Sequence, residues 1–183
     1  MTGTQANARI WSNVDVSVAD VGSTLPTTVA ASLDAAFDLA GYMDEDGGIE
    51  FAHTRTVSDH FAYGGELLRS AVKGEKHTFK FMALENNLVV ENLINPGGTV
   101  VTASGVSTVS LFNYQPNPKA WVVEFSDGEI GERIVIPKGE VVDAVDTQQY
   151  TDDGILKFGI TVTCYSIAGV WGKKISTNPA LAS

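Results

Sequence analysis

Few residues in this sequence have the types and spacing that chemistry requires, and most of them lie at predicted turns. Asp127 and Glu129 form a pair of carboxylates of the kind that general acid–base catalysis uses. Asp152 and Asp153 form a second pair. Each pair adjoins a glycine between two strand-like segments, where acidic side chains usually hydrogen-bond the turn backbone. No serine lies in a nucleophile-elbow pattern, and no glycine-rich segment has the lysine of a phosphate-binding loop. We therefore predict no catalytic residues and no enzyme activity.

Candidate metal ligands are also sparse. The acidic run at 44–48 is similar to the start of a calcium-binding loop, but its twelfth position is Arg55, where glutamate is required. A looser site of carboxylates alone is the alternative interpretation. Cys164 is the single cysteine, and its place on the apolar face of a predicted strand indicates a buried side chain rather than a nucleophile.

The three histidines show no shared partner in the sequence. His77 lies on an apolar strand face, which favours a core position, and His53 and His60 lie in a segment predicted to be a loop. The sequence therefore predicts no metal site and no cofactor.

The charge of the chain is strongly acidic. With 22 acidic and 12 basic residues the net charge is −10, whereas proteins that grip nucleic acid are usually basic because phosphate neutralisation supplies the affinity. Residues 1–50 and 120–153 hold most of the acids, and the segments between and after them do not. Acidic segments of one copy of the chain can contact the less acidic segments of another copy. The alternative is that the net charge serves solubility and that its uneven distribution along the sequence has no function.

Alternation of apolar and polar residues, which is typical of strands, dominates the chain. At 156–165 every second side chain is apolar, so one face is predicted to be buried. Segments 119–125 and 133–136 flank a turn and predict a hairpin, whose second strand Pro137 is expected to end. Further strands are expected at 76–81, 106–112 and 141–145.

Two segments have helical spacing instead. Residues 82–94 predict the principal helix, and 32–39 predict a short one capped by Ser32. About eight strands and one helix in 183 residues predict a single mainly β domain, a β-sandwich or open barrel flanked by the helix. The apolar runs are only a few residues long, so no membrane partner is expected.

The order of several motifs resembles that of the major tail tube proteins of long non-contractile-tailed bacteriophages, the siphophages. The turn-rich stretch 19–27 is followed by an acidic, glycine-rich stretch at 33–48. Phe79–Phe81 leading into 84–87, and the strands at 121–125 and 156–165, are similar to later parts of the family pattern. The resemblance extends from about residue 9 to 174.

This resemblance implies a structural protein of the virion tail that is assembled in the host cytoplasm. Subunits are expected to form hexamers whose sheets join into one continuous barrel. Stacked rings would form the conduit for genome ejection, through which DNA passes without specific binding. The tape measure, tail terminator and tail tip proteins are the expected partners.

The resemblance also implies where the contacts lie within one domain spanning 1–183. A long assembly loop at about 44–73 and arms at about 1–12 and 175–183 would bridge successive rings. The loop residues expected at the ring-to-ring contact are Asp59, His60, Phe61 and Tyr63, although this sequence lacks the family's tryptophan there. The candidates for facing the lumen are residues on the polar faces of predicted strands, Glu124, Lys157, Thr161 and Thr163. The alternative is that the net charge of the chain lies on the outside of the tube.

Three other functions are weighed against this one. A carbohydrate- or surface-binding β-sandwich of a tail tip or adhesin would need clustered aromatic side chains, whereas Trp11, Trp121 and Trp171 are scattered in the sequence. A β-rich hydrolase is disfavoured because no catalytic site is found. The tube protein of a contractile injection system is the closest structural alternative, and the acidic opening motif favours the non-contractile kind.

Overall fold

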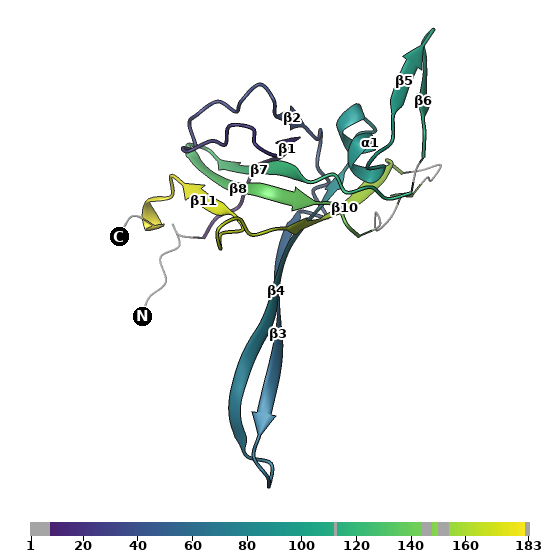
Figure 1. Cartoon of the computed structure of the whole chain (residues 1–183). Helices are drawn as coiled ribbons and strands as arrows, with labels where there is room; N and C mark the ends of the chain where they lie inside the picture. Colours follow the sequence, from purple (N-terminus) through teal and green to yellow (C-terminus); the bar gives the residue numbers. More distant parts are fainter. Residues whose placement is uncertain (1–7, 112, 144–147, 150–153, 182–183) are drawn as a thin grey trace.

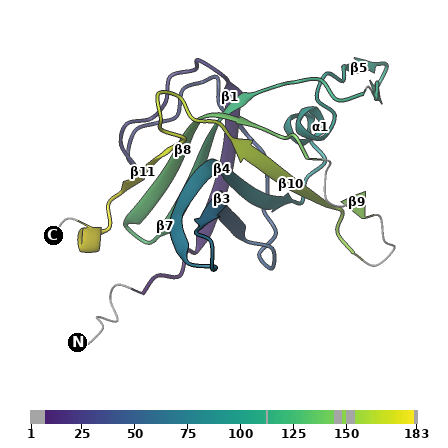
Figure 2. The ribbon, with the colours of Figure 1, turned by 60° about the horizontal axis from the view of Figure 1, so that its bottom comes forward.

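One nine-stranded antiparallel sheet is folded into two layers (Figures 1 and 2). The computed structural model describes residues 8–111, 113–143, 148–149 and 154–181. The first layer contains β2 (Asp38–Leu39), β1 (Asn13–Asp20), β7 (Lys119–Asp127), β8 (Ile130–Glu140) and β11 (Lys173–Ser176). The second layer contains β9 (Gln148–Gln149), β10 (Lys157–Cys164), β4 (Leu67–Ala83) and β3 (Ile49–Phe61). The layers join where β8 pairs with the end of β10.

Side chains from both layers meet in one apolar core. Trp121 of β7 is fully buried, and its ring meets the rings of Phe79 and Phe81 of β4 edge-on, with centroids 5.4 and 6.2 Å away. The predicted alternation along β10 is confirmed, since its core-facing residues are all buried: Phe158, Ile160, Val162 and Cys164. The mainly β sandwich or open barrel expected from the sequence is thus the observed architecture.

Helix α1 (Leu88–Ile94) lies on the flank of this core and contacts β10. Asn87 caps it, because its side-chain oxygen accepts a hydrogen bond from the backbone N–H of Val90 at 2.9 Å. The helix is shorter than the predicted 82–94. Met82 and Ala83 belong to β4 instead, where they pair with β10.

The segment expected to be a long loop at 44–73 is largely a β-hairpin. β3 and β4 pair from Ile49 and Phe81, inside the domain, to Phe61 and Leu67 at the far end. Figure 1 shows the hairpin projecting well beyond the rest of the fold. Gly64 and Gly65 make its turn with positive φ angles of 103° and 89°, which other residues rarely adopt.

Other local predictions also differ from the structure. Strand β8 continues through Pro137, which lies at an irregularity in the β7–β8 register where no ladder donor is needed. Residues 32–37 form an irregular segment with a turn at 35–36 rather than a helix, and β2 follows them. The predicted strand at 141–145 is not formed at 141–143, and its remainder lies outside the described residues.

The remaining elements lie at the periphery. β5 (Val100–Ala103) and β6 (Val106–Val109) form a separate two-stranded sheet, and a 3-10 turn covers Pro179–Leu181. The expected C-terminal arm begins with two residues of β11 that pair with β8, Ile175 and Ser176. Among the described residues, no helix has the length and apolar character needed to cross a membrane.

Candidate functional site

The end of the β3–β4 hairpin brings together the four residues predicted to make ring-to-ring contacts. Asp59, His60 and Phe61 end β3, and Tyr63 follows in the turn. The Asp59 carboxylate accepts a hydrogen bond of 2.6 Å from the Ser70 hydroxyl of β4, which joins the two strands near the tip. Phe61 is 60% exposed and Tyr63 fully exposed.

Apolar side chains are exposed along the outer half of this hairpin. This apolar tip comprises Val57, Phe61, Tyr63, Leu67, Leu68 and Val72. A two-stranded ribbon by itself is marginally stable in water. Exposed apolar patches of this kind mark contact surfaces. The tip therefore has the character of a surface that a partner covers.

Three of the four predicted lumen residues share one face of β10. Lys157, Thr161 and Thr163 lie opposite the buried side chains of the strand, and Thr161 pairs across to Lys80 of β4. The Lys157 ammonium is 2.7 Å from the Asp44 carboxylate. That hydrogen bond is the main reason why the pKa of Lys157 is raised. The positive charge on this face is thus partly neutralised within the chain.

Glu124 does not belong to that group. It lies on β7, where its carboxylate is 2.5 Å from the Nε atom of the buried Arg133 of β8. The Nη1 atom of Arg133 also donates to the backbone carbonyls of Thr28 and Ala31, at 2.8 and 2.6 Å. Glu124 and Arg133 therefore fasten the segment between β1 and β2 onto the sheet.

Replacing Arg133 with methionine is expected to destabilise the protein by about 3 kcal/mol, because the Glu124 charge and two carbonyls lose their partner. Chemical denaturation followed by circular dichroism measures the change. Lys76→Met is the matched control, since its 3.5 Å pair with Asp143 is half exposed on both sides and should change stability by less than about 1 kcal/mol. Equal losses in the two variants would contradict the assigned role.

The histidines that the sequence left without partners are brought together by strand register. His53 of β3 lies directly opposite His77 of β4, and their rings stack with centroids 4.1 Å apart. Trp171 stacks on the other face of His77 at 4.7 Å. No spacing rule points to this cluster, because the two histidines belong to strands whose register follows from the whole hairpin. His60 lies far along the same strand, near the tip.

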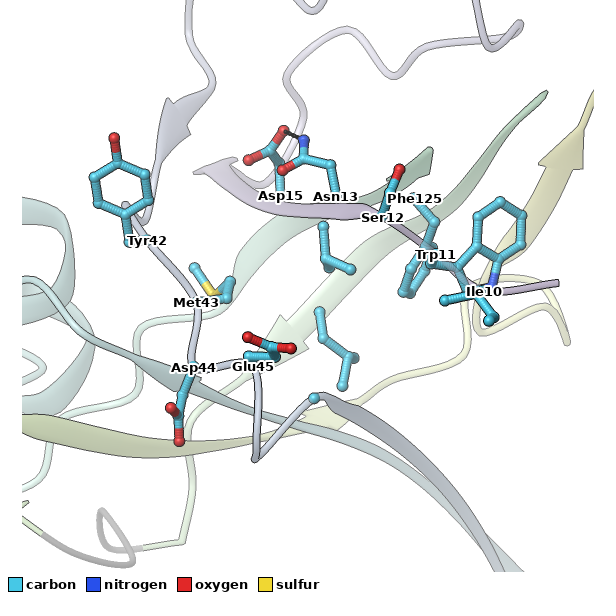
Figure 3. A pocket seen from close by; sticks show the side chains of 13 residues that line it. Ile10, Trp11, Ser12, Asn13, Asp15, Tyr42, Met43, Asp44, Glu45 and Phe125 are labelled. Carbon is cyan, nitrogen blue, oxygen red and sulfur yellow. Dashed lines mark hydrogen bonds between the residues drawn. The ribbon is translucent and has the colours of Figure 1, made fainter. Parts of the chain in front are cut away.

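A hollow of about 680 Å³ lies between the start of β1 and the segment before β3 (Figure 3). Its acidic residues are Asp15, Asp44 and Glu45, and no histidine or lysine is among the described residues that line it. Tyr42 and Trp11 lie at opposite ends of the hollow (Figure 3), so they do not form one aromatic platform. Trp11 lies instead beside Phe125, with ring centroids 5.7 Å apart and ring planes tilted by 47°.

Cys164 is buried in the core, and that burial raises the pKa of its thiol to about 12. We expect iodoacetamide at pH 8 to leave the folded protein unmodified and to label it fully in denaturant, because the thiolate is the reactive form. Intact-mass spectrometry distinguishes the two states. Rapid labelling of the folded protein would contradict the buried assignment.

Comparison with known proteins identifies the family of the chain. A family model described as phage tail tube protein matches residues 1–173, which include the projecting hairpin and every described strand except most of β11. No curated protein matches the sequence significantly. The family is a structural one whose members form the tube of the virion tail. The motif order, the sandwich architecture and this match lead to one conclusion: the chain belongs to the phage tail tube protein family.

Proposed function

We propose that copies of this chain close into hexameric rings, and that the rings stack into the DNA conduit of a long non-contractile tail. The observation that carries the proposal is the state of the sheet edges. β3 pairs only with β4 among the described strands. The ladders that β10 forms with β8 and β9 involve only its two ends, at Thr163–Cys164 and Lys157–Phe158. Such edges invite pairing with another chain, and neighbours in a ring would satisfy them.

The size of the resulting barrel suits DNA. The second layer contributes four strands per copy, β9, β10, β4 and β3. Six copies would give a barrel of about 24 strands, whose backbone diameter is about 48 Å at a spacing of ~4.8 Å and a tilt of ~40°. After side chains are added, a bore of roughly 35–40 Å remains, which is wider than a DNA duplex.

The polar face formed by β10 and β4 suits a lumen that does not retain DNA. It carries Lys157 of β10 and Lys80 of β4, but Lys157 is paired with Asp44, and Glu50 of β3 is the cross-strand neighbour of Lys80. The chain as a whole carries −10, so each ring is strongly anionic. Repulsion between this charge and phosphate acts within about 8 Å of the wall at physiological salt. DNA then passes without specific binding.

The hairpin provides the contact between rings in this proposal. Its apolar tip extends beyond the domain, where the next ring would cover it (Figure 1). The two chain ends are the other ring-to-ring contacts. Assembly takes place in the host cytoplasm, and the tape measure, tail terminator and tail tip proteins complete the tail.

Negative-stain electron microscopy of the purified full-length protein tests the proposal. Rings or tubes of roughly 80–100 Å outer diameter are expected, from the barrel geometry plus one outer layer. A protein that stays monomeric at all concentrations and binds glycans would overturn the proposal and favour a carbohydrate-binding sandwich.

A further inference from the structure

We propose that His53, His77 and Glu75 bind a transition-metal ion of the Zn²⁺ class at the base of the projecting hairpin. One donor atom from each residue lies within 4.8 Å of the other two. The Oε2 atom of Glu75 is 3.8 Å from Nε2 of His53 and 3.9 Å from Nε2 of His77. Two imidazoles and a carboxylate are a donor set that zinc accepts, and imidazole also suits Cu²⁺ and Ni²⁺.

The strands place these donors on one face. His53 and His77 are direct cross-strand partners, and Glu75 precedes His77 by two residues, so its side chain lies on the same side of β4. The stack with Trp171 holds the His77 ring in place. His77 is therefore the fixed ligand of the three.

Arg55 orients the carboxylate without occupying the proposed ligand atom. Its Nε atom donates to Oε1 of Glu75 at 2.7 Å, whereas Oε2 is the oxygen nearest both imidazoles. Ligating carboxylates in metal sites are commonly held in this way by a second hydrogen bond. The hydrogen bond from Arg55 is also the main reason why the pKa of Glu75 is lowered.

Solvent reaches the site, and one ligand can adjust. His53 is 37% exposed and Glu75 45% exposed, whereas His77 is 13% exposed. Zinc–nitrogen bonds of about 2.0–2.1 Å need the donors closer together than they lie, so the stacked rings must open. His53 is the more exposed of the two rings and is the one that would turn. Water or a group from another copy would complete the coordination.

An ion at this position would join β3 to β4 where the hairpin leaves the two-layered body. It would stiffen the hairpin base whether or not the chain forms tubes. The inference is therefore independent of the ring proposal, and a negative result for one leaves the other standing.

Isothermal titration of the untagged full-length protein with ZnCl2 tests the site. We expect one ion per chain, with affinity reduced roughly tenfold or more in His53→Gln and in Glu75→Gln. His60→Gln is the matched control, since His60 lies on the same strand outside the cluster and should leave the affinity unchanged. Circular dichroism confirms that each variant is folded.

A second measurement uses the wild-type protein alone. Co²⁺ should broaden the imidazole NMR signals of His53 and His77 and leave those of His60 sharp. Absence of Zn²⁺ binding by the wild type, equal binding by the His53 and Glu75 variants, or broadening confined to His60 would each overturn the proposal.

Discussion

Replacing both Phe61 and Tyr63 with serine is expected to leave rings that no longer join into tubes. Both aromatic side chains are exposed at the hairpin tip, and the proposed contact with the next ring would bury them. Burial of one such side chain is worth about 2 kcal/mol, and the loss recurs in every copy around a ring. If the tip is the contact that we propose, the affinity between rings therefore falls by several orders of magnitude. The backbone of β3 within the domain, which is proposed to close each ring, is not changed by these substitutions.

Sedimentation velocity and negative-stain microscopy measure this loss. Glu66→Gln is the control, because Glu66 is exposed in the same turn but adds no apolar surface. It should form tubes as the wild type does. Tubes of normal length from the double-serine variant would show that the tip is not the contact between rings.

Replacing Trp121 with alanine is expected to destabilise the protein by about 3–5 kcal/mol, the range for removing a buried large aromatic side chain. Trp121 is fully buried between Phe79 and Phe81, and its indole N–H donates to the Gly139 carbonyl at 3.1 Å. A side chain on Gly139 would come within 3.1 Å of the indole ring, so the site is closely packed and cannot readily collapse around a cavity. A loss of this size is comparable to the whole stability of many domains.

Urea denaturation measures the effect on Trp121→Ala, with Tyr42→Ala as the control. Tyr42 is 77% exposed, so its removal should change stability by no more than about 0.5 kcal/mol. Trp121→Phe should fall between the two, since a ring remains but the Gly139 carbonyl loses its buried donor. Equal stability of Trp121→Ala and Tyr42→Ala would contradict the central place of Trp121 in the core.

Alternation in sequence predicted the strands that have one face in the core. Along β10 every second side chain enters the core, so the pattern of the sequence and the pattern of burial coincide. The β7–β8 hairpin was predicted for the same reason, together with its turn at Gly128. The mainly β fold could be predicted from these elements, and the tail tube family from the order of the family motifs.

Alternation of apolar and polar residues did not predict the structure of strands with two exposed faces, or of a segment whose sequence suits both a strand and a helix. Beyond Arg55 the hairpin exposes both faces, and irregularities at Thr56/Val57 and His60/Phe61 shift the alternation, so the sequence there predicts a loop rather than two strands. Residues 82–94 have helical spacing throughout. Pairing of Met82 with Gly159 nevertheless extends β4, and the helix begins only after the Asn87 cap.

Contacts between strands distant in sequence were decided by the folded structure. Periodicity indicates which face a side chain occupies, but it does not indicate which residue of another strand lies opposite. The contacts of His77 with His53 and Trp171, and of Arg133 with Thr28, therefore depend on the register of the strands and the path of the chain over the sheet. The local sequence determines which side chains of each strand share a face, so the core could be predicted. The packing of all strands together determines their register, so the histidine cluster could not be predicted.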